Sequence, residues 1–133
     1  MKEELTNGNI LSLCFWGRNH KLEIVFDVYD GESILPVQEL ALDQFVNKID
    51  LLDTVRLSVE EYIKETKPED VQLDTLENLR KYVAPRSIFI KRPRNSDRII
   101  AILCEYVYDI EDGIAIVFVN EQLAKVGKQN IIL

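Results

Sequence analysis

Two apolar runs, IIAILC at positions 99–104 and IAIVFV at positions 114–119, decide the fold of this chain. Apolar residues fill successive positions in both runs, so both faces of each strand must be covered. The stretch between the runs, residues 109–113, is rich in Asp and Gly and has the composition of a hairpin loop. The sequence therefore predicts two central antiparallel strands, over residues 98–108 and 113–119.

Further strands are predicted on both sides of this central pair. β-Branched and aromatic residues dominate positions 10–16 and 22–29, and the second run alternates apolar and polar residues. Residues 17–20, Gly-Arg-Asn-His, have turn chemistry, so we expect a hairpin between these two strands. The remaining strand-like segments lie at 86–91, 123–126 and 130–133.

The residue period changes from two to about 3.6 after Pro36, as in a helix with one apolar face. This face comprises Val37, Ala41, Phe45, Ile49 and Leu52. We expect a helical region from Val37 to Thr66, as one helix or as two separated near Asp50, with Phe45 packed against the sheet. A shorter helix is predicted over residues 71–82.

These elements predict an α+β fold. We expect a mostly antiparallel sheet of five to six strands packed against two or three helices, in the order β-β-α-α-β-β-β. A chain of 133 residues has the usual size of one domain, so a single domain is predicted over residues 1–133.

The composition predicts a globular protein of the cytoplasm. Apolar residues make up 47% of the chain and charged residues 29%. No apolar run reaches the roughly 18 residues of a membrane-spanning helix, and the first residues are polar rather than those of a signal peptide. Cys14 and Cys104 both lie in strand-like segments, so we expect buried, reduced thiols.

The charge distribution favours a basic partner. The formal net charge is −7, and residues 1–80 carry 17 acidic against 8 basic side chains. Such a protein is repelled by phosphate, which argues against direct binding of nucleic acid or of an anionic membrane. The basic residues between positions 91 and 98 are interpreted as part of a solvated turn between two strands.

The residue inventory predicts no catalytic, metal or cofactor site. The single histidine, His20, falls in the predicted hairpin turn, where we expect it to be solvated. Cysteine and histidine together provide too few ligands for a zinc site, and no phosphate-binding glycine motif is present. One enzymatic alternative remains, a hydrolase that uses the carboxylates of Asp109, Glu111 and Asp112.

The loop between the central strands resembles a motif of a bacterial family of uncharacterised domains, whose last hairpin reads Trp-Asp-x-Glu-His-Gly. Asp109, Glu111 and Gly113 match this motif. Tyr108 stands at the Trp position, and Asp112 replaces the His. The similarity extends to Gln38 after Pro36, the spacing of Ala41 and Phe45, Tyr62, and the segment Val126-Gly127-Lys128-Gln129-Asn130.

The resemblance implies a function in toxin defence. Members of such families are often encoded beside secreted or contact-delivered toxins, which implies an immunity protein that neutralises a cognate toxin domain. The family carries no established catalytic residues, so we expect a binding protein rather than an enzyme; a housekeeping adaptor is the other binding alternative. The acidic side chains expected to contact the toxin are Glu60, Glu61 and Glu65 of the helical region and Asp109, Glu111 and Asp112 of the loop. The sequence does not predict the oligomeric state.

Overall fold

The computed structural model describes residues 8–72, 79–93 and 95–133. In this part of the chain, six strands form one sheet, in which they lie in the order of the sequence. They are β1 (Ile10–Phe15), β2 (Arg18–Phe26), β3 (Val83–Ile90), β4 (Ile99–Tyr106), β5 (Ile114–Val119) and β6 (Gln122–Gly127). All neighbouring pairs are antiparallel except β2 and β3, which run parallel. The predicted α+β fold is confirmed, with a mixed sheet and four strands after the helices.

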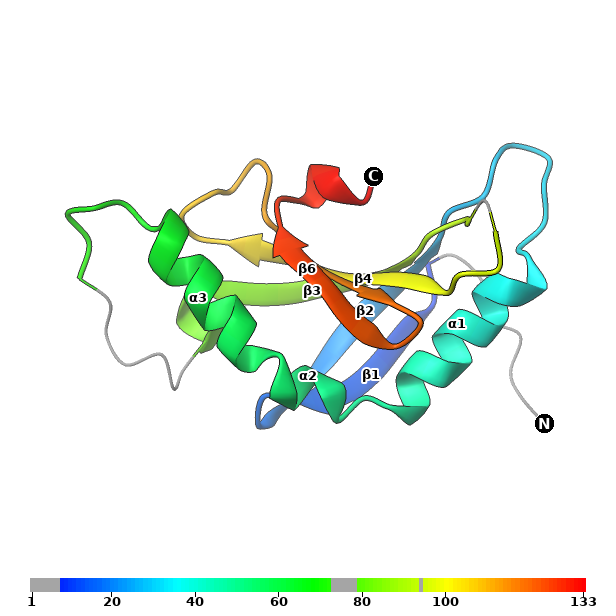
Figure 1. Cartoon of the computed structure of the whole chain (residues 1–133), viewed down its shortest axis with the longest axis horizontal. Helices are drawn as coiled ribbons and strands as arrows, with labels where there is room; N and C mark the ends of the chain where they lie inside the picture. The colour runs from blue at the N-terminus through cyan, green and yellow to red at the C-terminus, as the bar shows by residue number, and fades with distance from the viewer. Residues whose placement is uncertain (1–7, 73–78, 94) are drawn as a thin grey trace.

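In the described part of the connection between the two parallel strands there are three α-helices: α1 (Pro36–Asn47), α2 (Leu51–Thr54) and α3 (Arg56–Thr66). A parallel connection must cross from one end of the sheet to the other, and the helical segment makes this crossing along one side of the sheet (Figure 1). The helical region, for which the sequence left one helix or two open, breaks near Asp50 and again at Val55.

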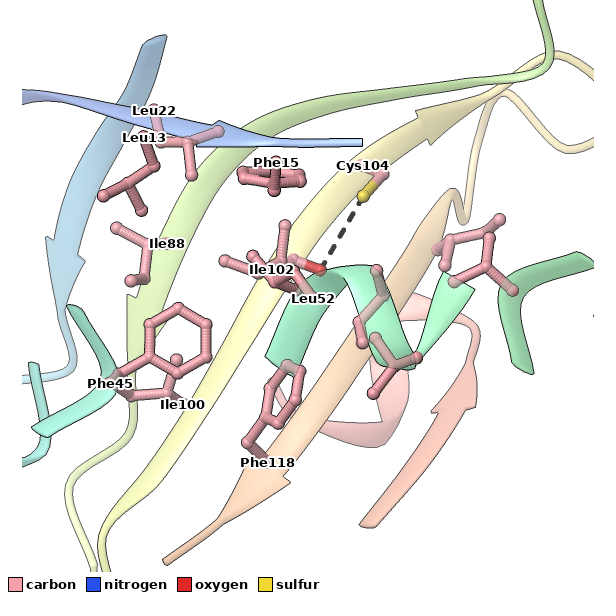
Figure 2. Close-up of a cluster of buried hydrophobic side chains, with 14 of the residues drawn as sticks. Leu13, Phe15, Leu22, Phe45, Leu52, Ile88, Ile100, Ile102, Cys104 and Phe118 are labelled. Carbon is pink, nitrogen blue, oxygen red and sulfur yellow. Dashed lines mark hydrogen bonds between the residues drawn. The ribbon is translucent and has the colours of Figure 1, made fainter. Parts of the chain in front are cut away.

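The main core lies between the helices and one face of the sheet. Phe45 of α1 is 1% exposed, and its ring contacts that of Phe118 in β5 edge to face, with 5.1 Å between the centroids. Figure 2 shows Phe45 and Leu52 next to the inward-facing side chains of β3 and β4, which include the fully buried Ile88 and Ile102. The prediction that Phe45 packs the helix against the sheet is confirmed.

A second, smaller core covers the opposite face of the sheet. Phe89, Ala101 and Val117 are buried there together with Ile132 from the C-terminal segment. This segment forms a short 3-10 helix, η2 (Gln129–Ile131), so the strand predicted at 130–133 is wrong. The Lys91 ammonium donates a hydrogen bond of 2.8 Å to the Ile132 carbonyl and holds the segment against the sheet.

The β1–β2 hairpin turns at Trp16 and Gly17, whose φ angles are +53° and +76°. Two central residues with positive φ are typical of the tight turns that match the strand twist. The indole N–H of Trp16 donates to the Leu52 carbonyl at 2.7 Å, and its backbone N–H donates to the Asp53 carboxylate at 2.8 Å. Because α2 fixes the turn, β2 begins at Arg18, and the predicted turn over residues 17–20 is wrong.

Two other sequence predictions need adjustment. β3 begins at Val83, three residues before the predicted start. Of the helix predicted over residues 71–82, positions 73–78 lie outside the described residues, and the described remainder contains only a 3-10 turn, η1 (Leu79–Lys81). Within the described residues, no helix has the length and apolar character needed to cross a membrane.

Candidate functional site

The loop between β4 and β5 is built around Asp109. Its carbonyl accepts a hydrogen bond of 2.9 Å from the Gly113 N–H, and its carboxylate accepts one of 3.2 Å from the Asp112 N–H. Gly113 has a φ of +56°, a conformation that residues with a side chain rarely adopt. Asp109 and Gly113 of the family motif therefore determine the shape of the loop.

The C-terminal turn is bonded to this loop. The Gln129 backbone N–H donates to the Asp112 carbonyl at 3.0 Å, and the Gln129 side chain donates to the Cys104 carbonyl at 3.1 Å. The Lys128 ammonium lies 3.8 Å from the Asp109 carboxylate and 3.5 Å from that of Asp112. The two motif segments, far apart in the sequence, thus form one structural unit.

Gln38, the other polar residue of the resemblance, is 1% exposed and joins α1 to the sheet. Its amide oxygen accepts a hydrogen bond of 2.9 Å from the Leu35 N–H at the start of α1. Its amide nitrogen donates to the carbonyls of Asp27 and Ile90, at 2.9 and 3.1 Å, where β2 and β3 end. Buried polar groups need such partners, so Gln38 has a structural role.

Aromatic side chains connect the loop to α3. Tyr106 contacts both Tyr62 of α3 and Tyr108 of the loop, with centroid distances of 6.0 and 5.6 Å. Burial first, and then the negative charges of Asp109 and Asp112, raise the pKa of Tyr62. The C-terminal half of α3 and the loop therefore lie side by side (Figure 1).

The predicted partner-binding acids differ in their accessibility. Glu61 is exposed and lies 3.6 Å from Lys64, while Glu65 and Glu111 are also exposed. The Glu60 side chain is only 17% exposed and is paired with Arg56 at 3.6 Å. We call the accessible set, Glu61, Glu65, Glu111 and the partly exposed Asp112, the α3–loop acidic surface.

Glu60 and Asp109 contribute mainly to the structure of this region. Glu60 is held by Arg56 on its own helix, and Asp109 is bonded within the loop and lies near Lys128. Partner contact by all six acids stays a prediction, and Glu61, Glu65, Glu111 and Asp112 are the more accessible of them. The rings of Tyr62 on α3, Tyr106 and Tyr108 contact one another in turn, so the helix and the loop that carry these acids adjoin.

The prediction that His20 is a solvated turn residue is wrong. The residue is buried in β2, with its ring stacked on that of Phe15 at a centroid distance of 4.0 Å. The Nε2 atom donates a hydrogen bond of 3.0 Å to the Phe15 carbonyl. Burial is the largest cause that lowers the pKa of His20, and the charge of Arg18 lowers it further.

The two cysteines are both free but lie in different environments. Cys104 is buried, and burial raises the pKa of its thiol, which keeps it protonated. Cys14 is exposed on β1, so the expectation of a buried thiol is wrong at this position. Within the described ranges, no group of three or more His, Cys, Asp or Glu residues is arranged to hold a metal ion.

The basic residues after β3 take part in intramolecular contacts, beyond the solvated turn that we expected. Arg92 pairs with Glu32, and its guanidinium lies over the Tyr29 ring at 5.7 Å from the centroid. Arg98 forms two hydrogen bonds to the Glu121 carboxylate, at 2.8 and 2.9 Å. Arg92 and Arg98 thus stabilise the fold, and Arg94 of the same basic stretch lies outside the described residues.

Sequence reasoning missed a basic hollow between β2 and β3. Its volume is about 480 Å³, and its lining includes Arg18, Lys21 and Arg86. The one available signal was Pro85, because proline in a strand marks an edge or a bulge. Arg86 is far from Arg18 and Lys21 in the sequence, so these basic residues form no cluster that the sequence alone would reveal.

Comparison with known proteins supplies a family but no activity. No curated protein and no solved structure matches the chain. The family described as domain of unknown function DUF6985 matches residues 2–133, which is nearly the whole sequence. The chain therefore belongs to the DUF6985 family.

Proposed function

We propose that this protein is an immunity protein that binds and neutralises a basic toxin domain in the bacterial cytoplasm. The observation that carries the proposal is the α3–loop acidic surface, where Glu61, Glu65 and Glu111 are exposed on adjoining elements. The negative balance of residues 1–80 and the resemblance to families encoded beside toxins support it.

Electrostatic complementarity explains how such a surface would act. A toxin that cleaves nucleic acid needs a basic cleft for the phosphates, and an acidic inhibitor can occupy that cleft. Complementary charges mainly accelerate association, which matters for an inhibitor that must act before the toxin reaches its substrate. The carboxylates on α3 belong to a regular element, so their spacing is fixed before binding.

The hydrolase alternative has less support. An acid–base pair needs carboxylates that can face a substrate, but Asp109 is engaged by the loop backbone and lies near Lys128. Asp112 lies near the same lysine, and its backbone carbonyl accepts from Gln129. The two aspartates are thus used to join the loop to the C-terminal turn.

The proposal is tested with the product of the neighbouring gene, which it predicts to be a basic toxin domain. We expect the association rate to fall steeply when salt is raised from about 50 to 500 mM, which shortens the screening length to a few ångströms. The variant Glu61→Lys/Glu65→Lys should slow association on the order of tenfold and weaken protection of cells that produce the toxin.

A matched control variant has the same change in net charge, but at and before α1 instead of on α3. Asp30, in the segment before α1, and Glu39, in the first turn of α1, are both exposed. Figure 1 shows α1 at the opposite end of the molecule from α3. The variant Asp30→Lys/Glu39→Lys should bind and protect nearly as the parent does. Equal losses in both variants, or association that is indifferent to salt, would show that this surface is not the interface.

A further inference from the structure

The strands β2 and β3 pair with each other along only part of their lengths. β2 pairs with β1 from Arg18 onward, but its parallel ladder with β3 covers only residues 23–26. On β3 the same ladder covers residues 87–90, although pairing with β4 begins at Val83. Within the described residues, the first parts of these two strands therefore have no ladder between them.

Pro85 explains why the ladder stops. Proline has no N–H to donate, and the register between β3 and β4 shifts between Pro85 and Ser87, as in a β-bulge. A bulge bends its strand, and the ladder between β3 and β2 begins only after it, at Ser87. We call the resulting opening, between residues 18–22 of β2 and 83–86 of β3, the β2–β3 seam.

The seam contains the basic hollow of about 480 Å³. Arg18, Lys21 and Arg86 line it and are exposed, and Asn19 adds a polar side chain. Arg86 also pairs with Glu105 of β4 at 3.1 Å. In a protein with a net charge of −7, this gathering of cations favours an anionic ligand.

A second hollow adjoins the seam along the start of β3. Its volume is about 360 Å³, and it shares Val83 and Ala84 with the first. Its other lining residues are mostly apolar and include Val107 and Ile110, which are 51% and 85% exposed. Exposed aliphatic side chains beside an apolar hollow favour contact with an apolar group of a ligand.

We propose that the β2–β3 seam binds an extended acidic peptide segment of a partner protein. The unpaired edges of β2 and β3 offer backbone hydrogen bonds to an added strand. Successive side chains of a strand alternate between the two faces of the sheet, so acidic side chains on one face of the segment meet Lys21 and those on the other face meet Arg18. An apolar side chain enters the second hollow beside Ile110. The seam lies outside the α3–loop acidic surface, whereas Ile110 of the second hollow is on the same loop as Glu111. Binding of a peptide here does not depend on the function proposed for that surface.

A peptide fits the seam better than nucleic acid does. A nucleic acid carries a phosphate at every nucleotide, and the seam has only three cations to pair with them. The remaining phosphates would be repelled by a protein whose net charge is −7. The second hollow is apolar and suits an aliphatic side chain. Free strand edges bind a peptide backbone, which nucleic acid lacks.

The test uses a fluorescein-labelled peptide of about ten residues in which Glu-Glu and Val-Val pairs alternate, so that both faces of the added strand carry Glu and Val. Fluorescence anisotropy should show saturable binding at about 50 mM salt that weakens as salt rises. Arg18→Glu/Lys21→Glu should weaken binding on the order of tenfold, and Ile110→Asp should weaken it as well. On binding, the amide hydrogens of Asn19 and Lys21 should exchange more slowly with solvent.

The control Lys48→Glu/Lys125→Glu changes two exposed lysines outside the seam and alters the net charge equally. It should bind the peptide nearly as the parent does. Four results would overturn the proposal: no binding, equal weakening by both double variants, equal binding of a peptide with Lys in place of Glu, or tighter binding of a short single-stranded DNA. Circular dichroism verifies that each variant is folded. If Arg18→Glu/Lys21→Glu does not fold, Arg18→Gln/Lys21→Gln replaces it.

Discussion

The Gln129 side chain donates a hydrogen bond of 3.1 Å to the Cys104 carbonyl, across the position where Gly113 has no side chain. A Cβ atom at residue 113 would lie 2.5 Å from that carbonyl oxygen and 2.7 Å from the Gln129 amide nitrogen. Glycine is therefore needed at position 113 for two reasons: it adopts the positive φ, and it leaves space for the hydrogen bond between Gln129 and Cys104.

The change Gly113→Ala should destabilise the protein by more than the backbone strain of about 1–3 kcal/mol, because the added methyl also displaces this hydrogen bond. Gly31 is the matched control, since it has a φ of +78° but no atom within 4 Å of an added Cβ. Gly31→Ala should lower the free energy of unfolding by the strain alone. Equal losses in a urea titration would contradict the clash at Gly113.

The change Phe45→Ala should lower the free energy of unfolding by roughly 3–5 kcal/mol, because it leaves a cavity against Phe118 in a well-packed core. Leu40 lies on the same helix but is 45% exposed, so Leu40→Ala should cost much less. Thermal and urea unfolding measure both. Similar melting temperatures for the two variants would show that α1 is not packed through Phe45.

The sheet and the helical face could be predicted because burial imposes a period on the sequence. Alternation and 3.6-residue spacing follow from which side chains face the core, and Ala41, Phe45 and Leu52 are indeed buried. The β1–β2 turn could not be predicted in the same way. Trp16 has a positive φ, which local preference disfavours, and contacts with Leu52 and Asp53 stabilise it.

The candidate site was only partly predictable for a related reason. Sequence spacing indicates which helix carries Glu60 and Glu61, but their unequal exposure depends on Arg56 and on how α3 packs. Lys128 comes close to Asp109 and Asp112 because the sheet brings the ends of β4 and β6 together. Such long-range pairs leave no periodic signal in one sequence.

The stability of the fold should fall as the pH decreases below the ordinary pKa of histidine, about 6.5. Burial lowers the pKa of His20 in the folded protein, so the unfolded chain binds the proton more readily. The contribution of His20 is therefore present above pH 6.5 and is lost as the pH falls towards the lowered pKa. In His20→Gln, which cannot titrate, this part of the pH dependence should disappear from urea unfolding measured between about pH 7.5 and 5. An unchanged slope would mean that the pKa of His20 is the same in the folded and unfolded chains.

The last prediction concerns which acids around α3 face the partner. Glu111 is exposed at the tip of the loop, whereas Glu60 is 17% exposed and is paired with Arg56. If the proposed toxin binds the α3–loop acidic surface, Glu111→Lys should slow association severalfold, and its effect should add to that of Glu61→Lys. Glu60→Gln should instead leave the association rate nearly unchanged and reduce stability by less than about 1 kcal/mol, the range of helical ion pairs.

Stopped-flow association and thermal unfolding of the same variants separate these two effects. A partner that approached from the Arg56 side of α3 would reverse the order, with Glu60→Gln slowing association and Glu111→Lys having little effect. The interface would then lie away from the loop, and the family motif would serve the fold alone. The loop is bonded to the C-terminal turn through Gln129. If Glu111 contacts the toxin, the family motif that shapes this loop therefore also positions a residue that binds the partner.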